Sequence, residues 1–152
     1  MLNIGHRTIG LDAPPLVIAE IGVNHDGSEA RALALLHAAA EAGADAVKFQ
    51  LFEAKRLLSS AARLAAYQER SGANDPLAML AELELSVDAV GRLVEAAHKA
   101  NVAAVVSVFS TELVEPMAAH PVDAFKTAST DIINRPLINA MIVADRPLLL
   151  ST

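Results

Sequence analysis

Five short apolar segments alternate with helix-forming segments along this 152-residue chain, and this rhythm constrains the fold more than any other feature. Apolar residues at successive positions are typical of strands buried on both faces of a parallel sheet. Strands that alternate with helices predict right-handed crossovers in an α/β fold. We therefore expect five parallel strands in sequential order, over residues 15–21, 45–50, 102–109, 122–129 and 146–152.

The helix expected over 28–44 has the clearest pattern. Leu33, Leu36 and Ala40 fall on one predicted helical face, and Gly43 follows as a C-terminal stop. Ser86 is a capping residue that predicts the start of a second helix. The other expected elements are a hairpin in 2–10, a helix from Ser86 to about Ala100, and helices over 110–120 and 134–144.

The connection over 51–85 is unusually long for a compact domain. It contains helix-forming pieces and a turn signal at "SGANDP". Long connections in compact domains are commonly lids or disordered segments. We expect a partly helical flap over the C-terminal ends of the strands, with a mobile turn.

Composition excludes several classes of protein. The chain is 53% hydrophobic, but its apolar runs are shorter than the roughly 18 residues that a membrane span needs. Without cysteine it has no disulfide and no thiolate metal site. A net charge of −6 without a basic run argues against a nucleic-acid surface. The start of the chain lacks the features of a signal peptide, so we expect a cytoplasmic protein.

Every predicted strand is apolar until its C-terminal end and then presents a polar side chain. Strand side chains alternate in direction, so each polar residue shares a face with apolar residues two and four positions earlier. The C-terminal rim of parallel strands is where α/β barrels and doubly wound sheets build their active sites. Two lysines with hydroxyl groups form a receptor for a phosphate or carboxylate. The residues concerned are Glu20, Lys48, Ser107, Lys126 and Ser151.

Each of these residues also has a structural explanation. Glu20 and Lys48 could form a buried ion pair with no function, and Lys126 could extend its ammonium group to solvent. Serines at strand ends commonly bond to the backbone. His25 is interpreted as a loop or capping residue, with metal ligation as the less favoured alternative. The coincidence on five strands favours a site.

Five sequence blocks resemble the sialic acid synthase family, which includes the N-acetylneuraminate, legionaminate and pseudaminate synthases and their spore-coat polysaccharide relatives. The similarity runs through the whole chain in the order and spacing of the family. One block departs from the pattern: the family's Ser-Thr-Pro-Phe is "VSVF" here, with Ser107 in the threonine place and Val108 replacing proline. The matching blocks are "IAEIGVNHDG", "AAAEAGADAVKFQ", "AFKTAST", "NRPLI" and "RPLLLST".

The resemblance implies a (β/α)₈ barrel of the TIM type. In this family the barrel condenses phosphoenolpyruvate with an N-acetylated hexose, such as N-acetylmannosamine, to a nine-carbon keto sugar acid, and phosphate is released. The chain would cover five strands and four helices, so residues 1–152 are expected to be the N-terminal portion of the barrel domain. The other half of the barrel and a C-terminal antifreeze-like domain are expected to be absent.

The resemblance also implies a cofactor and a partner. The family enzymes use a divalent metal, Mn²⁺ or Mg²⁺, whose histidine ligands lie on later strands, so no metal ligand is expected in this chain. The full-length enzymes are expected to be homodimers. Neither a membrane nor a nucleic acid is an expected partner.

The roles of individual residues follow from the resemblance alone. Glu20 and Lys48 are the candidate catalytic residues, and Glu20 with Gln50 would face the sugar and the reacting carbons. Asn74 would lie in the loop that closes on the sugar. Lys48 would also bind the carboxylate and phosphate of phosphoenolpyruvate, together with Ser107, Lys126, Ser129 and Ser151.

Two alternatives remain at this stage. One is a related enzyme, a 3-deoxy sugar-acid phosphate synthase, which a screen of aldose acceptors would distinguish. The other is a non-catalytic truncated fragment that associates with a partner chain or with itself. We expect the 152-residue chain alone to be inactive, because the metal ligands are expected elsewhere.

Overall fold

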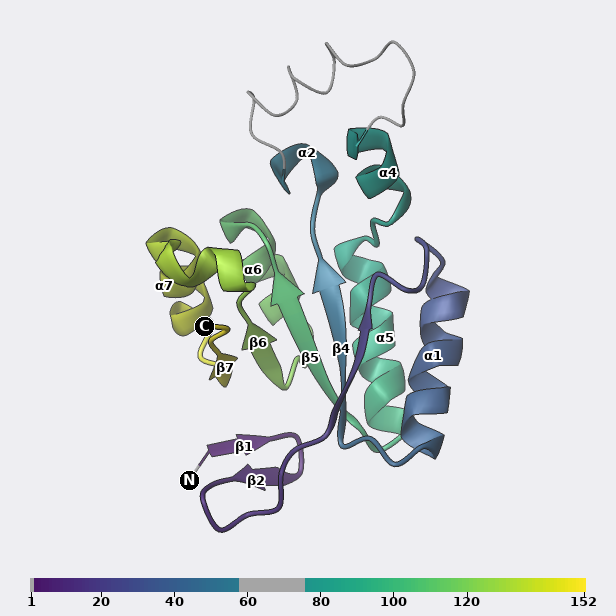
Figure 1. Ribbon diagram of the computed structural model, residues 1–152, viewed down its shortest axis with the longest axis vertical. Coiled ribbons are helices and arrows are strands. Elements are labelled where there is room, and N and C mark those ends of the chain that lie inside the picture. Colours follow the sequence, from purple (N-terminus) through teal and green to yellow (C-terminus); the bar gives the residue numbers. More distant parts are fainter. Residues whose placement is uncertain (1, 58–75) are drawn as a thin grey trace.

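A five-stranded parallel sheet forms the centre of the computed structural model, which describes residues 2–57 and 76–152 (Figure 1). The strands follow one another in sequence order, and every neighbouring pair is parallel. The predicted α/β class and strand order are therefore confirmed, while closure into an eight-unit barrel stays a prediction. The strands are β3 (Ile18–Gly22), β4 (Ala46–Leu51), β5 (Ala103–Val108), β6 (Ala124–Lys126) and β7 (Leu148–Leu149).

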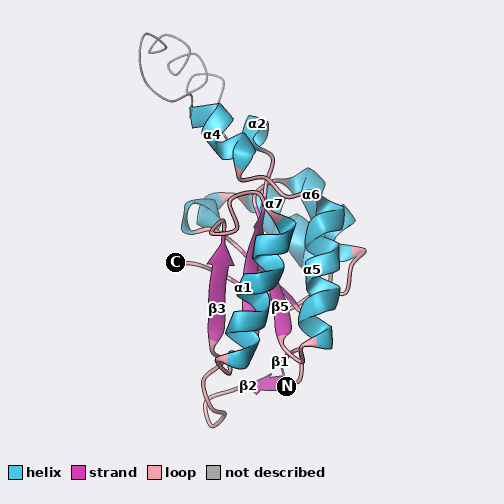
Figure 2. Cartoon of the chain, turned by 90° about the vertical axis from the view of Figure 1, so that its right-hand side faces the viewer, coloured by secondary structure: helices cyan, strands magenta, loops and turns pink. Residues whose placement is uncertain are grey.

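Helices cover one face of this sheet, as the side view in Figure 2 shows for the first two of them. Adjacent helices also contact each other, so they form a continuous outer layer. Two short helices stand at the C-terminal ends of the strands instead (Figure 1). The covering helices are α1 (Glu29–Glu41), α5 (Val87–Lys99), α6 (Thr111–Ala118) and α7 (Arg135–Val143), and the short ones are α2 (Ala54–Leu57) and α4 (Pro76–Glu82).

The two short helices are the described parts of the predicted flap. They contact each other, and both lie beyond the C-terminal end of β4 (Figure 1). Residues 58–75, with most of the predicted turn at "SGANDP", lie outside the described residues. The helical character of the flap is thus confirmed in part, and the mobility of its turn stays a prediction.

Serine caps fix the starts of two covering helices. The hydroxyl oxygen of Ser28 accepts a hydrogen bond from the Arg31 amide at 3.2 Å, and that of Ser86 accepts one from the Ala89 amide at 3.1 Å. Each bond satisfies an amide that has no partner inside its helix. The helix predicted from Ser86 is confirmed.

The predicted buried face of α1 is wrong at one position. Leu33 is 37% exposed, whereas Ala32 and Leu36 are fully buried. The helix packs against α5 as well as the sheet, so its buried stripe faces both neighbours. In a helix so rich in alanine and leucine, periodicity alone fits more than one face.

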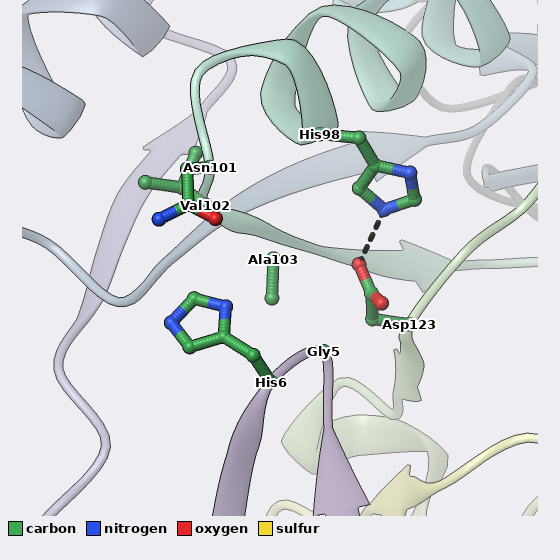
Figure 3. A pocket seen from close by; sticks show the side chains of 7 residues that line it. All are labelled: Gly5, His6, His98, Asn101, Val102, Ala103 and Asp123. Atoms are coloured by element: carbon green, nitrogen blue, oxygen red, sulfur yellow. Dashed lines mark hydrogen bonds and ion pairs between the residues drawn. The ribbon is translucent and has the colours of Figure 1, made fainter.

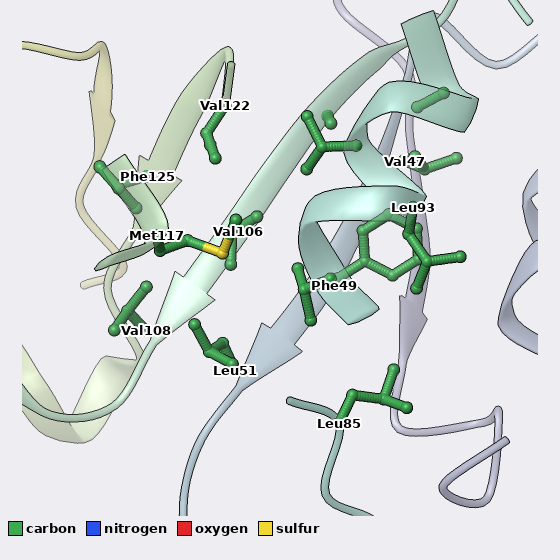
Figure 4. Packing of buried hydrophobic residues seen from close by; sticks show 14 of the residues in the cluster. Val47, Phe49, Leu51, Leu85, Leu93, Val106, Val108, Met117, Val122 and Phe125 are labelled. Atoms are coloured by element: carbon green, nitrogen blue, oxygen red, sulfur yellow. The ribbon is translucent and has the colours of Figure 1, made fainter. Parts of the chain in front are cut away.

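Two apolar clusters lie on opposite sides of the sheet. The larger one fills the space between sheet and helices and includes Phe49, Leu93 and Phe125 (Figure 4). The smaller one lies on the inner face and consists mainly of small side chains on the central strands. Odd-numbered residues of β4 and even-numbered residues of β5, such as Val47 and Val106, face the helices. Val105, next to Val106 in sequence, lies in the inner cluster instead.

A hairpin of β1 (Leu2–Ile4) and β2 (Arg7–Ile9) covers the N-terminal end of the inner face (Figure 1). The Arg7 guanidinium pairs with the Asp45 carboxylate, which also accepts a hydrogen bond from the Val17 amide at 2.8 Å. The turn of the hairpin is so close to the sheet that a Cβ on Gly5 would lie 2.8 Å from that of Ala103. The predicted hairpin is confirmed and closes this end of the sheet.

The last two strands are shorter than predicted. β6 pairs with β5 only from Ala124 to Lys126, and a 3₁₀ helix, η1 (Ser129–Ile133), begins three residues later. β7 contributes only Leu148–Leu149. After Lys126 the chain turns away to continue as η1, which shortens the paired region of β6.

No helix in residues 2–57 or 76–152 combines the length and the apolar character that crossing a membrane requires.

Candidate functional site

The strand register brings the predicted polar residues to one face and one end of the sheet. Glu20 pairs with Lys48, Gln50 pairs with Ser107, and Ser107 pairs in turn with Lys126. Residues paired in a parallel sheet point to the same face, and residues two positions apart do so as well. All of these side chains therefore point away from the helices, toward the inner face at the C-terminal rim.

A charged pair anchors the rim. The Lys48 ammonium nitrogen lies 2.5 Å from an oxygen of the Glu20 carboxylate. Lys48 is only 7% exposed, whereas the Glu20 side chain is 52% exposed. Removing an ammonium group from water is costly unless a partner offsets its charge. The carboxylate supplies this offset from the solvent side and leaves the cation close to the open rim.

A bulge at the end of β3 makes room for this pair. The register shifts between Glu20 and Gly22, and Gly22 has a φ of +55°. A Cβ on Gly22 would lie 2.9 Å from an oxygen of Glu20 and 3.4 Å from the amide nitrogen of Gln50. The two side chains are thus packed directly on the bare glycine backbone.

The second lysine is bonded to the main chain. Lys126 is half-buried, and its ammonium group donates a hydrogen bond to the Thr127 carbonyl at 3.0 Å. Among the described residues the Lys126 ammonium group has no other partner, so the Glu20 carboxylate is paired with Lys48 alone. A main-chain carbonyl carries no net charge, so the Lys126 cation remains available to an anion.

Thr127 belongs to the rim although the sequence did not single it out. The residue is fully buried, and its hydroxyl oxygen accepts a hydrogen bond from the Ser151 amide at 3.0 Å. The Thr127 carbonyl accepts the hydrogen bond of the Lys126 ammonium group. Thr127 therefore positions two other rim residues, Lys126 and Ser151. The sequence feature that could have identified Thr127 is its position between Lys126 and Ser129 in the "FKTAS" block.

Two further residues predicted for the site, Ser129 and Asn74, are not part of the described rim. Ser129 is exposed at the start of η1, beyond the end of β6. Asn74 lies outside the described residues. The described rim therefore consists of Thr127 together with six predicted residues: Glu20, Lys48, Gln50, Ser107, Lys126 and Ser151.

A pocket of about 260 Å³ lies at the other end of the sheet, beside the hairpin (Figure 3). Its walls include His6, His98 and Asn101. The Asp123 carboxylate accepts a hydrogen bond from the Ala104 amide at 2.7 Å and lies 2.7 Å from the His98 ring nitrogen Nε2. This carboxylate therefore links the segment before β6 to β5 and α5. We interpret this pocket as structural, because the two lysines suited to an anion lie at the rim instead.

Possible metal ligands are sparse. Residues 2–57 and 76–152 contain no group of three or more His, Asp or Glu side chains arranged to hold a metal ion. His25, the residue for which metal ligation was the less favoured alternative, is a buried loop residue whose Nδ1 accepts a hydrogen bond from the Gly27 amide at 3.1 Å. The described rim is suited to an anion.

Substitution of Gly22 tests the bulge. Gly22→Ala is expected to lower the free energy of unfolding by about 1–3 kcal/mol, because alanine is strained at a positive φ. The new Cβ also displaces the Glu20 carboxylate from Lys48. Urea denaturation measures the effect, with Gly10→Ala as the control, since nothing lies within 4 Å of a Cβ there. Equal stability of the two variants would contradict the close packing at Gly22.

Comparison with known proteins gives one family. Residues 35–152 match the NeuB family. N,N'-diacetyllegionaminic acid synthase of Campylobacter jejuni is 39% identical over 139 residues, which are 90% of this chain and 42% of that protein. The spore coat polysaccharide biosynthesis protein SpsE of Bacillus subtilis is 35% identical over 151 residues, which are 99% of this chain and 40% of that protein.

A solved structure agrees in fold. The N-acetylneuraminic acid (sialic acid) synthetase of Leptospira borgpetersenii, solved in complex with citrate, superposes with a TM-score of 0.84 at 26% identity. The match covers 98% of this chain and 48% of that chain. The chain thus spans about two fifths of the length of the two curated relatives and about half of the solved one.

Proposed function

Since the chain belongs to the NeuB family, we propose that it carries the phosphoenolpyruvate-binding part of a synthase for sialic-acid-type sugars. In this proposal the methylene carbon of phosphoenolpyruvate bonds to the aldehyde carbon of an N-acetylated hexose. One water molecule is consumed and phosphate is released, which yields a nine-carbon keto sugar acid. The five-stranded sheet is the N-terminal part of a (β/α)₈ barrel.

The buried Lys48 ammonium group at the rim is the observation that carries this proposal. Its partner Glu20 stands on the solvent side, so the cation lies beneath an open polar surface. Lys126 adds a second cation on β6, two strands away from Lys48, where it pairs in register with Ser107 of the intervening strand β5. Two cations and a hydroxyl group on one face match the carboxylate and phosphate of phosphoenolpyruvate.

The other rim residues take roles that fit their positions. Ser107 and Ser151 offer hydroxyl groups to the anion, and Ser129 joins them from the start of η1. Gln50 and Glu20 lie beside each other over Gly22 and face the sugar. The Glu20 carboxylate, which contacts Lys48, can accept a hydrogen bond from a sugar hydroxyl or take up a proton in the reaction.

The divalent metal of the proposed reaction does not fit the described residues. They offer no group of three candidate ligands, so no step is assigned to a metal at this rim. The proposal assigns its ligands to residues other than 2–57 and 76–152. What these described residues do is bind and orient the anion.

Titration with phosphoenolpyruvate tests the binding step. Addition of the anion to the purified chain is expected to shift the backbone amide resonances of Ser107, Thr127 and Ser151 in a proton–nitrogen correlation spectrum. Resonances of His98 and Asn101, at the opposite end of the sheet, are expected to stay unchanged. Shifts confined to that opposite end would refute the proposed site.

Phosphate release tests the reaction. N-acetylated hexoses and phosphorylated aldoses are compared as acceptors in the presence of Mn²⁺. Release that depends on an N-acetylated hexose supports the proposed synthase, whereas release with phosphorylated aldoses alone would favour a 3-deoxy sugar-acid phosphate synthase. Binding at the rim without release is the result that we expect of the purified chain, because the resemblance places the metal ligands of the family on later strands of the barrel.

A further inference from the structure

His25 is a buried titratable residue with no role in the proposed reaction. It lies in the loop between β3 and α1 and is fully buried. Its Nδ1 accepts a hydrogen bond from the Gly27 amide at 3.1 Å, so the proton of the neutral ring is on Nε2. Within residues 2–57 and 76–152, Nε2 has no hydrogen-bond partner. A buried donor without an acceptor costs stability, so packing alone does not explain an imidazole here.

One end of this loop sets the space for the rim. Gly22, at the end of β3, has its Cα packed against the Glu20 carboxylate and the Gln50 amide. The turn that follows joins this strand end to the rest of the loop, since the Asn24 amide donates a hydrogen bond to the Ile21 carbonyl at 3.0 Å. A shift of the Gly22 backbone would therefore move the surface on which Glu20 and Gln50 rest.

The other end of the loop is fixed against the flap. Gly27 has a φ of +70°, and a Cβ there would lie 2.1 Å from the Glu82 carbonyl oxygen at the end of α4. The backbone at Gly27 is therefore in direct contact with α4. Because the fully buried His25 ring binds the Gly27 amide and follows Gly22 by three residues, it fills the loop between these two glycines.

We propose that His25 is a positioning residue, whose buried imidazole braces the loop from Gly22 to Gly27 and thereby holds Glu20 and Gln50 beside Lys48. The proposal rests on the proposed function, since it concerns the arrangement of the same anion-binding rim. It also predicts that the seating of α4 and the geometry of the rim change together. The chemistry required at position 25 is a buried acceptor at the place of Nδ1.

Protonation removes this brace. Nδ1 cannot accept the Gly27 amide when it carries a proton, so the charged ring releases that end of the loop. Burial lowers the pKa of His25 from its ordinary value, and the Gly22 carbonyl and the Asp26 carboxylate oppose this lowering. Asp26 is itself paired with Arg31 of α1, and α4 meets the loop through the main chain of Glu82. The release therefore occurs on the acidic side of the ordinary histidine pKa.

Substitutions at position 25 test the brace through phosphoenolpyruvate affinity. His25→Leu fills the space without an acceptor and is expected to weaken binding about tenfold or more. His25→Asn places an amide oxygen near the position of Nδ1 and is expected to restore most of the affinity. The matched control is His37→Leu, on the exposed surface of α1, which is expected to bind like the unmodified chain. Unchanged affinity in His25→Leu would overturn the proposal.

A pH series separates positioning from general stability. The affinity of the unmodified chain is expected to fall on acidification more than that of His25→Asn, which cannot protonate there. The phosphate of the ligand titrates in both proteins, so the difference between them is the quantity to compare. Parallel pH profiles would contradict a role for the His25 proton.

Two further measurements keep the outcomes distinct. If the unmodified chain does not bind phosphoenolpyruvate, the proposed function fails, and the side-chain amide resonances of Gln50 then decide the brace. These resonances are expected to shift in His25→Leu and to stay in place in His25→Asn, and no shift in either variant would overturn the proposed brace.

If His25→Leu does not fold, His25→Gln replaces it, because the amide oxygen of glutamine lies nearer the place of Nε2 than that of Nδ1. Equal behaviour of the Asn and Gln variants would then overturn the proposal.

Discussion

Phe125→Ala is expected to lower the free energy of unfolding by about 3–5 kcal/mol, the usual cost of removing a fully buried aromatic ring. Phe125 has no exposed surface and lies in the large cluster beside Met117, Val106 and Val122 (Figure 4). Its strand, β6, is short, so side-chain packing contributes much of what holds it between β5 and β7. Urea denaturation followed by circular dichroism measures the loss.

The control for this substitution is Leu11→Ala. Leu11 is fully exposed in the connection after β2, so its truncation is expected to change stability by less than about 0.5 kcal/mol. A loss below about 1 kcal/mol for Phe125→Ala would mean that the cluster closes over the missing ring. The packing of β6 between its neighbours would then be looser than described.

Lys48→Met is expected to weaken phosphoenolpyruvate binding about tenfold or more, which corresponds to about 1.4 kcal/mol. A charge-assisted hydrogen bond contributes about 1.5–3 kcal/mol, and methionine cannot donate one. Stability is expected to change by less than about 1.5 kcal/mol, because methionine has a similar length and suits a buried site. The half-exposed Glu20 carboxylate remains hydrated after its partner is removed.

This combination of results distinguishes a binding lysine from a structural one. Calorimetric titration gives the affinity, and urea denaturation gives the stability of the same variant. Lys99→Met, on the exposed surface at the end of α5, is the matched control and is expected to change neither quantity. A large loss of stability with unchanged affinity would show that the Glu20–Lys48 pair is structural, the alternative considered from the sequence.

The faces of the strands could be predicted from the sequence because side-chain alternation is a local property. The parity of Lys48, Ser107 and Lys126 alone placed them on one face, and the register confirms it. Helix starts at Ser28 and Ser86 were equally local, because a capping hydroxyl bonds an amide three residues away. The binding roles of these residues stay predictions.

Features that depend on distant segments could not be predicted. His25 is buried because the loop meets α4, whose residues lie more than fifty positions later in the chain. The bulge at Gly22 depends on side chains from β4. The buried face of α1 is set by contacts with both α5 and the sheet, and Leu33 lies outside that face. No pattern within the α1 sequence indicates that α5 is its neighbour.

The separation of the two clusters by the sheet has a consequence for protein engineering. Phe49 and Phe125 pack under the helices, whereas Lys48 and Lys126, each adjacent to one of them in sequence, face the other way. Substitutions at sites without shared contacts usually have additive effects on stability. Variants that alter the ligand preference of the rim can therefore be combined with variants that fill the helix-side core. A library that randomises only the inward-facing rim positions would leave the folding determinants on the other side intact.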